Sequence, residues 1–246
     1  MIGMHEGRTA LITGASSGLK RTAAELLARD GAEVVLVARR EALLETVAAG
    51  VRERGGKAWA IPWDLSQVET LGDLARKVKE RAGRLDLLVN NAGREHFAPL
   101  QATPPRVVDE LLQLNPASPL LLTRSLLGVL KDGSAVVFMA SASALAGAPG
   151  LSVYAATKGA LMALTRSLAR ELAPAGCGST PWRRARCART CWTACWRGWP
   201  PTRPPSWRRC TPWASVNPRT WRPPWLSWAG RRPGGPPGRC WWWTEG

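Results

Sequence analysis

The stretch RTALITGASSGLK, residues 8–20, decides the fold of this chain. Residues 8–13 are a short apolar run that predicts a buried strand, and a helical pattern follows over residues 22–28. The glycines and serines between them let the backbone approach a ligand closely, and the N–H groups and dipole of a helix N-terminus favour an anion. We therefore predict a strand, turn and helix that bind the phosphates of a dinucleotide. The alternative is a glycine-rich turn without a ligand.

The next apolar run, residues 33–38, predicts a second strand and is followed by Arg39 and Arg40. NAD enzymes usually have an acid at this point, which binds the ribose hydroxyls, whereas a guanidinium suits a 2′-phosphate. The sequence therefore favours NADP as the cofactor, with NAD still possible, and Arg39 as the contact. The alternative is a solvated arginine pair that opens a helix.

Strand and helix patterns alternate with short turns in the following residues. Helices are predicted over residues 41–54 and 68–82, and strands over residues 57–62 and 85–89. This alternation is typical of an α/β fold with a doubly wound parallel sheet, Rossmann-like and in a single domain. Ligands of such folds bind beyond the carboxyl ends of the strands, where the sequence places Gly14, Arg39, Asp64, Asn91 and Ser141.

A helical pattern over residues 103–131 is interrupted at Asn115 and Pro116. Proline has no N–H to donate and disfavours the helical conformation of the residue before it. A kink at this point would free a backbone carbonyl for a water molecule. The alternative is an ordinary polar residue beside a proline break.

The stretch SASALAGAPGLSVYAATK, residues 141–158, contains the only tyrosine of the chain. Tyr154 and Lys158 are four residues apart, so on a helix over residues 151–173 their side chains share a face and the ammonium favours the ionised phenol. Ser141 follows the strand pattern of residues 136–139, which places its hydroxyl within reach of the same substrate oxygen. The alternative is an amphipathic helix with an interfacial tyrosine and a solvated lysine.

These motifs, in this order and at these distances, resemble the short-chain dehydrogenase/reductase family over residues 8–176. They are Thr13-Gly14-x-x-x-Gly18, Asn90-Asn91-Ala92-Gly93, Asn115, Ser141 and Tyr154-x-x-x-Lys158. The resemblance implies an NAD(P)-dependent oxidoreductase that interconverts a small-molecule carbonyl and an alcohol. It also implies a homodimer or homotetramer. Within the family, reduction of a 3-oxoacyl carrier protein and oxidation of a sugar or steroid both remain open.

The resemblance implies a role for each matching residue. Tyr154 is the expected acid and base, and Lys158 is expected to lower the pKa of Tyr154 and to hold the nicotinamide ribose. Ser141 is expected to orient the substrate oxygen, and Asn115 to hold a water in a proton relay. The expected cofactor-binding residues are Gly14, Ser16, Ser17, Gly18, Leu19, Arg39, Asp64, Leu65, Asn91, Ala92, Gly93, Tyr154 and Lys158. No metal site is expected.

Three features depart from the family pattern. Lys20 stands where the family has a third glycine, at a place where close helix–strand packing favours no side chain. Pro116 is unusual after the helix asparagine. The family's Pro-Gly segment, which closes over the nicotinamide and begins the substrate loop, is missing.

The composition changes abruptly at about Gly176. Residues 1–176 carry 21 Lys and Arg against 17 Asp and Glu, whereas residues 177–246 carry 13 Arg, no Lys and one Glu. The formal net charge of +16 therefore arises mostly from the tail, which also holds all six cysteines and 12 of the 14 tryptophans. Long runs in it show no helical or strand period.

The genetic code suggests a cause for this change. If the codons of residues 240–246 are read in the frame that begins at the third base of each codon, they must encode Leu-Val-Val-Asp and can then encode Gly-Gly. In the same frame, the codons of residues 178–187 can encode V-N-A-V-A-P-G-P-V. Both strings match strands of the family. We therefore interpret residues 1–176 as the NADP-binding domain and residues 177–246 as a frameshifted, disordered tail. The sixth and seventh strands would then be lost and the edge of the fifth unpaired.

Three further expectations concern location, partners and solubility. The N-terminus lacks a signal-peptide pattern and no apolar run reaches the length of a membrane span, so a cytoplasmic location is expected. A genuine Arg/Trp-rich tail would be an alternative that binds nucleic acid, and Cys187, Cys191 and Cys195 would be alternative metal ligands. We expect neither, because the shifted phase explains both compositions. We expect the chain as it stands to be largely insoluble or inactive.

Overall fold

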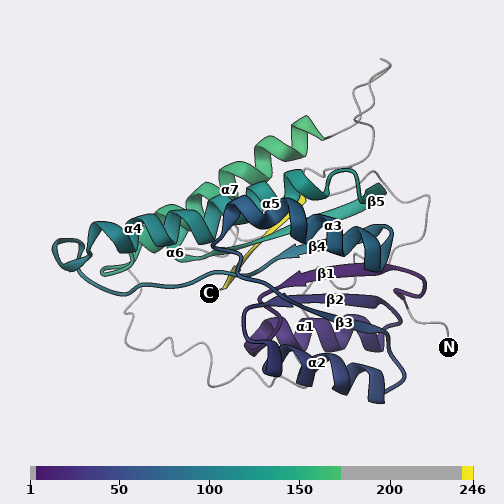
Figure 1. Cartoon of the computed structure of the whole chain (residues 1–246). Coiled ribbons are helices and arrows are strands. Elements are labelled where there is room, and N and C mark those ends of the chain that lie inside the picture. The colour runs from purple at the N-terminus through teal and green to yellow at the C-terminus, as the bar shows by residue number, and fades with distance from the viewer. Residues whose placement is uncertain (1–3, 173–239, 246) are drawn as a thin grey trace, which may run out of the picture.

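The computed structural model describes residues 4–172 and 240–245 (Figure 1). The strands are β1 (Thr9–Thr13), β2 (Glu33–Ala38), β3 (Ala58–Pro62), β4 (Leu85–Asn90), β5 (Leu130–Ser141) and β6 (Cys240–Glu245). The α-helices are α1 (Gly18–Arg29), α2 (Glu41–Glu53), α3 (Leu71–Ala82), α4 (Pro105–Leu112), α5 (Ser118–Leu126), α6 (Ser143–Ala146) and α7 (Ser152–Glu171). Short 3₁₀ turns lie at η1 (Val68–Thr70) and η2 (Leu100–Ala102), and η3 (Gln113–Ala117) is a π-helix.

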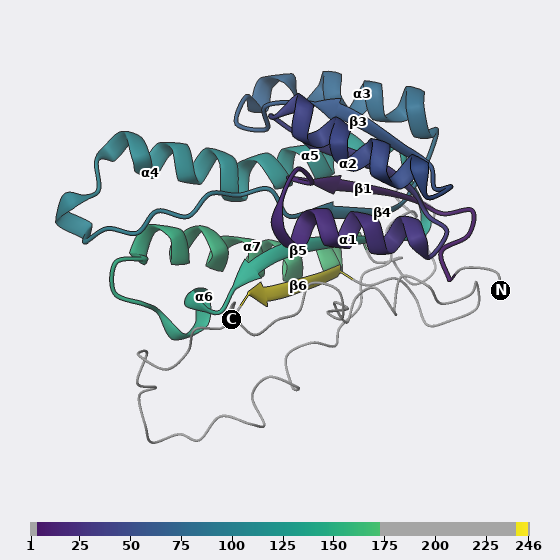
Figure 2. The same cartoon turned by 90° about the horizontal axis from the view of Figure 1, so that it is seen from below.

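The six described strands form one parallel sheet in the order β3-β2-β1-β4-β5-β6. Helices α1 and α2 pack on one face, and α3, α5 and α7 pack on the other (Figures 1 and 2). The predicted α/β class and doubly wound arrangement are therefore confirmed. Because the described strands all run parallel, their carboxyl ends meet at one edge of the sheet.

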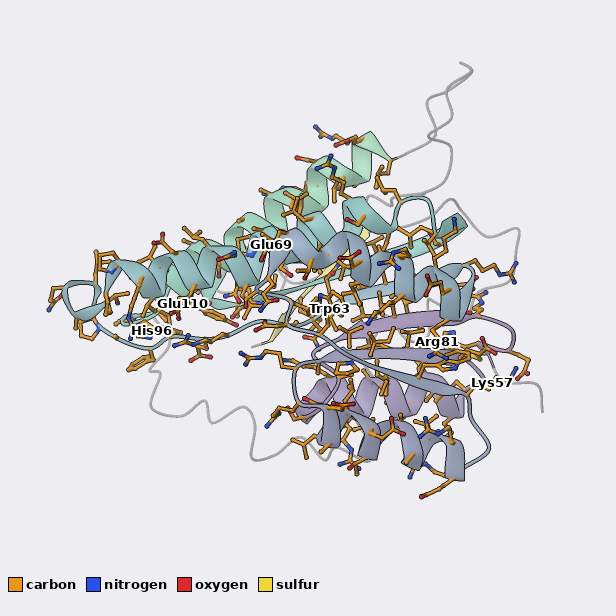
Figure 3. All side chains as sticks on the ribbon, viewed as in Figure 1. Lys57, Trp63, Glu69, Arg81, His96 and Glu110 are labelled. Carbon is orange, nitrogen blue, oxygen red and sulfur yellow. The ribbon has the colours of Figure 1, made fainter. Side chains whose placement is uncertain are left out.

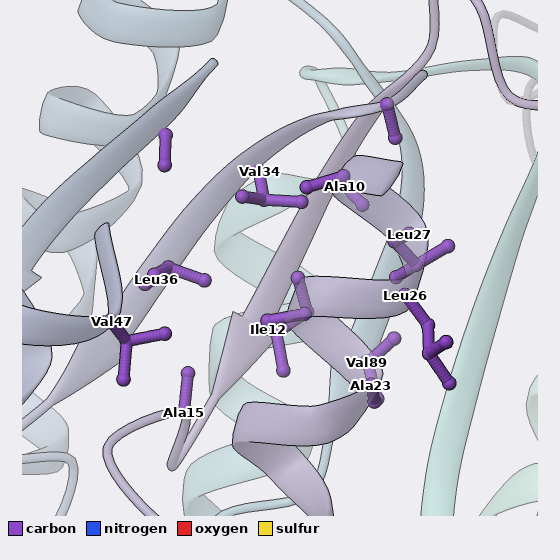
Figure 4. Close-up of a cluster of buried hydrophobic side chains, with 14 of the residues drawn as sticks. Ala10, Ile12, Ala15, Ala23, Leu26, Leu27, Val34, Leu36, Val47 and Val89 are labelled. Carbon is purple, nitrogen blue, oxygen red and sulfur yellow. The ribbon is translucent and has the colours of Figure 1, made fainter. Parts of the chain in front are cut away.

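Alternate strand residues belong to the two faces, as the two-residue period of a strand requires. Ile12 and Leu36 pack against α1 and α2 (Figure 4), whereas Leu11 and Val35 pack against the helices of the other face. All four side chains are fully buried. This burial on both faces explains why β1 and β2 have continuous apolar sequences rather than alternating ones.

The predicted interruption near Asn115 lies where expected and takes the form of η3. The backbone N–H of Ser118 donates to the carbonyl of Gln113, five residues earlier, as in a π-helix. Pro116 and Pro119 have no N–H, so the carbonyls of Leu112 and Asn115 lack the donors that an α-helix would supply. Two boundaries differ from the prediction: α5 ends at Leu126 and β5 already begins at Leu130.

The predicted unpaired edge of the fifth strand is wrong. Strand β6 pairs in parallel with residues 136–141 of β5, at the edge of the sheet seen in Figure 2. Its sequence, CWWWTE, contains no proline and is rich in residues that favour strands, and an exposed strand edge offers a ready template for pairing. The tail prediction otherwise falls on residues 173–239, which lie outside the described residues.

Candidate functional site

A cavity of about 210 Å³ lies beyond the carboxyl ends of β3, β2, β1 and β4. It brings together eight of the predicted cofactor-binding residues: Gly14, Ser16, Ser17, Arg39, Asp64, Leu65, Ala92 and Gly93. Five further residues that the cofactor prediction did not include complete its lining: Lys20, Ala38, Arg40, Trp63 and Leu114. Trp63 is labelled in Figure 3, close to the ends of the strands. The cavity therefore crosses four neighbouring strand ends.

The turn between β1 and α1 passes very close to the end of β4. Gly14 has a φ of 73°, and a Cβ there would lie 3.1 Å from Cα of Ala92 and 3.1 Å from Cδ of Lys20. A side chain at residue 14 would fill the space, so glycine is required both for its conformation and for this approach. The hydroxyl of Thr13 holds the two strands together, accepting from the N–H groups of Asn91 (2.9 Å) and Ala92 (3.0 Å).

The N-terminus of α1 has the features of an anion site. Ser17 precedes the helix with extended backbone angles and makes no side-chain capping hydrogen bond, and the first turn contains no acidic residue. The helix begins at Gly18, whose φ is 61°. The first N–H groups of a helix have no partner within it, and the helix dipole adds to their positive potential. Five of the predicted cofactor-binding residues are not in the cavity lining: Gly18, Leu19, Asn91, Tyr154 and Lys158. Gly18 and Leu19 lie in the first turn of α1.

Two arginines and an aspartate occupy the other side of the cavity. Arg39 and Arg40 are exposed, and Nη2 of Arg40 donates to Oγ of Ser16 (3.3 Å) and Oγ of Ser17 (3.1 Å). Oδ1 of Asp64 accepts from the N–H of Ser66 (3.0 Å) and from its hydroxyl (2.7 Å), which fixes the carboxylate. Arg40 thus bridges the strand β2 end and the β1–α1 turn.

Helix α7 places Tyr154 and Lys158 together in the interior. Lys158 is 5% exposed and Tyr154 is 8% exposed. Nζ of Lys158 lies 5.6 Å from the centroid of the Tyr154 ring and donates a 2.6 Å hydrogen bond to the carbonyl of Met139 on β5. The alternative of a solvated lysine is therefore wrong. A buried ammonium is stabilised by acceptors within reach, and the carbonyl of Met139 is one of them.

Hydrogen bonds of Asn115 connect helix α7, which carries Tyr154 and Lys158, to the segment that lines the cavity. Its Oδ1 accepts from the N–H of Arg94 (2.9 Å), and its Nδ2 donates to the carbonyl of Arg94 (2.9 Å) and to Oγ1 of Thr157 (3.0 Å). A Cβ on Gly93 would lie 3.1 Å from Oδ1 of Asn115 and 3.5 Å from Nζ of Lys158. Since Gly93 also lines the cavity, the cavity and the Tyr154–Lys158 pair adjoin at this glycine.

Ser141 lies at the end of β5, two residues after the carbonyl that binds Lys158. It is 7% exposed, and its Oγ accepts from the hydroxyl of Ser143 at 3.0 Å. A hydroxyl that accepts in this way keeps its own hydrogen for another acceptor. All four predicted catalytic residues thus lie on elements that meet beyond the same sheet edge.

Sequence reasoning missed the site's connecting residues. Arg40 was treated only as a neighbour of Arg39, and Lys20 only as a departure from the family pattern. Thr157 stands between two motif residues, Tyr154 and Lys158, yet its bond to Asn115 joins residues 42 positions apart. Trp63 could have been found from the sequence, because it directly precedes Asp64, a residue that was predicted to bind the cofactor.

Comparison with known proteins gives consistent matches. The chain matches the family described as short chain dehydrogenase over residues 8–178. It is 36% identical over 170 residues to an uncharacterized oxidoreductase of Methylorubrum extorquens, with 69% of this chain and 68% of the relative covered. It is 39% identical over 179 residues to a fatty acyl-CoA reductase of Mycobacterium tuberculosis, with 71% of this chain covered. The chain spans only 61% of the length of that reductase.

Solved structures agree with this match. A short chain dehydrogenase of Burkholderia cenocepacia, in complex with NADP, is 33% identical with a TM-score of 0.66 over 69% of this chain and 70% of that one. A dehydrogenase/reductase of Sinorhizobium meliloti is 37% identical with a TM-score of 0.65, over 68% of this chain and 67% of that one.

None of the helices in the described residues is long and apolar enough to cross a membrane.

Proposed function

The chain belongs to the short-chain dehydrogenase/reductase family of NAD(P)-dependent oxidoreductases, and from this premise we propose that it is an NADP-preferring enzyme that interconverts a small-molecule carbonyl and its alcohol. The observation that carries the proposal is the buried Lys158 beside Tyr154, next to a cavity with anion-binding features. The proposal extends to a cytoplasmic homodimer or homotetramer. It also takes residues 1–176 as the NADP-binding domain and residues 177–246 as the product of a frameshift.

The described residues fit a nicotinamide dinucleotide. Gly14 and Gly93 both line the cavity, and a Cβ at either would lie 3.1 Å from an atom of Ala92 or of Asn115 respectively, so neither position accommodates a side chain without displacing the cavity wall. Between them lies the N-terminus of α1 for the diphosphate, and Asp64 and Leu65 line the region expected for adenine. The preference for NADP rests on Arg39 and Arg40, because guanidinium groups pair with a 2′-phosphate.

The contacts of the side chains support the catalytic roles that we propose. When bound, the nicotinamide supplies or accepts the hydride at the reacting carbon. Tyr154 transfers the proton to or from the substrate oxygen, and the ammonium of Lys158 stabilises the phenolate that results. Ser141 donates its remaining hydrogen to the same substrate oxygen, because its lone pair already accepts from Ser143.

The backbone carbonyl of Asn115, and not its side chain, takes part in the proposed proton relay. Its side-chain donors and Oδ1 are bonded to Arg94 and Thr157, so the side chain acts as a clamp. Its carbonyl lacks the usual donor four residues later, because that residue is Pro119. We assign to this carbonyl the water of a proton relay that leads to Lys158.

The test is Tyr154→Phe, made in the full chain and in a frame-restored form. The panel contains ketones, aldehydes, 3-oxoacyl thioesters, sugars and steroids, together with fatty acyl-CoA substrates, which the name of the fatty acyl-CoA reductase relative suggests. We expect turnover with NADPH to fall by about a hundredfold or more, since general acid catalysis contributes roughly 10²–10⁴-fold. The midpoint of denaturant unfolding should stay at that of the wild type, which shows that the variant is folded. Unchanged turnover in the variant refutes the mechanism.

A second function, of another class, is binding of single-stranded nucleic acid by the Arg/Trp-rich tail. Only the composition favours it. Salt-sensitive binding by a tail peptide supports this function only if the gene sequence also confirms the reading frame of the tail.

A further inference from the structure

Lys20 brings a third cation into the cavity, away from the two arginines. Arg39 and Arg40 follow β2, whereas Lys20 is on the first turn of α1, which follows β1. Cδ of Lys20 and Cα of Ala92 both lie 3.1 Å from the position that a Cβ of Gly14 would take. The stem of Lys20 therefore lies where the ends of β1 and β4 meet.

The order of the strands separates these two positive regions. It is β3-β2-β1-β4, and neighbouring strands are about 4.8 Å apart, so the four strand ends span roughly 14 Å. An extended ligand in this cavity meets Arg39 near the end of β2 and Lys20 near the ends of β1 and β4, whereas Arg40 reaches from β2 to Ser16 and Ser17 of the β1–α1 turn. NADP has anionic groups at two such separate places, the 2′-phosphate and the diphosphate.

We propose that Lys20 binds the diphosphate of the dinucleotide, adding a full positive charge to the N–H groups and dipole of α1. This inference rests on the proposed function. It gives the lysine a role at a position where close packing of helix on strand favours glycine. The charge-assisted contact compensates for the side chain that has to be accommodated beside Gly14.

The two dinucleotides, used as a pair, distinguish Lys20 from the arginines. Both NADPH and NADH carry the diphosphate, and only NADPH carries the 2′-phosphate. Lys20→Met should therefore raise the Kd of both by the same factor, about ten- to a hundredfold at low salt, and the loss should shrink as salt is added. Arg39→Ala should weaken NADPH alone. The Kd values are measured by fluorescence titration or calorimetry, without turnover.

Two fragments and two control variants sharpen the experiment. ADP, which has the diphosphate, should bind Lys20→Met more weakly, whereas 2′-AMP should bind it as it binds the wild type. Arg21→Met removes the same charge from the neighbouring residue, whose Nε pairs with Oε1 of Glu25 at 2.9 Å and which does not line the cavity. It should leave all four ligands unchanged. Lys20→Arg should restore most of the affinity.

The remaining outcomes overturn the inference. Unchanged Kd values in Lys20→Met, or tighter binding in Lys20→Gly, show that the lysine does not bind the diphosphate. A loss confined to NADPH and 2′-AMP assigns Lys20 to the 2′-phosphate instead. If the wild type binds neither dinucleotide, the proposed function fails, and this inference fails with it. The first three outcomes leave the proposed function intact.

Discussion

The proposed preference for NADP depends on charge at single residues of the cavity. Arg39 and Arg40 are both exposed and both line the cavity, but Arg40 already donates to the hydroxyls of Ser16 and Ser17. We therefore propose Arg39 as the guanidinium that contacts the 2′-phosphate, whereas Arg40 hydrogen-bonds to the β1–α1 turn. Arginine is suited to this task because its planar donors match a phosphate.

Arg39→Ala should raise the Kd of NADPH by roughly ten- to a hundredfold, the value of one charge-assisted contact, and leave that of NADH unchanged. Both constants are measured for the wild type and the variant by fluorescence titration. Arg106→Ala, at an exposed arginine of α4 outside the cavity lining, is the matched control and should change neither. An unchanged ratio of the two constants removes Arg39 from the cofactor site.

Which residues could be predicted from the sequence depends on how far apart their partners lie. Gly14 and Lys158 belong to compact local patterns, and the structure gives the first a positive φ and places the second beside Tyr154. The contacts that connect these patterns were not predictable, because they depend on packing. Arg40 reaches back 24 residues to Ser16, and Asn115 reaches forward 42 residues to Thr157.

At the scale of elements, η3 joins the middle of the sheet edge to α7. Its π-helical turn inserts the side chain of Asn115 where it binds both the segment after β4 and Thr157 of α7. Thr157 in turn donates to the carbonyl of Tyr154 at 2.7 Å. The location of the break follows from the prolines, but their sequence does not reveal that the side chain becomes a clamp.

Asn115→Ala should lower the free energy of unfolding by about 2–4 kcal/mol, because it removes three hydrogen bonds, two to the part-buried backbone of Arg94 and one to the buried hydroxyl of Thr157. Gln113→Ala, at an exposed position of the same turn, should cost less than about 0.5 kcal/mol. Denaturant unfolding of both variants measures the difference. Equal losses in the two variants would mean that the hydrogen bonds of Asn115 contribute nothing specific.

At the scale of the whole molecule, the sheet continues beyond the part that the family motifs cover. The sequence predicted a fifth strand with an unpaired edge, whereas β6 pairs with it from Val136 to Ser141. The prediction failed because it judged the tail by its prolines as a whole, and residues 240–246 contain none. In the shifted phase the same stretch encodes Leu-Val-Val-Asp, so the residues read in either phase favour a β-strand.

The last prediction compares this chain with one in which the shifted phase is read after Gly176. Its aliphatic strands should cover β5 and α7 more completely, since each buried aliphatic side chain contributes about 1.5–3 kcal/mol. We expect higher soluble yield, a higher unfolding midpoint in denaturant, tighter binding of NADPH and elution as a homo-oligomer. The control is the present chain, prepared identically.

The prediction depends on the gene as well as on the protein. If sequencing across the codons of residues 175–178 shows the frame to be intact, and the present chain is soluble and binds NADPH as tightly as the altered one, then the frameshift proposal is wrong. In that case β6 as it stands, CWWWTE, completes a working sheet. If only the altered chain binds the dinucleotide, the missing strands are what hold the nicotinamide end of the site together, because α7 carries both Tyr154 and Lys158 and packs on β5.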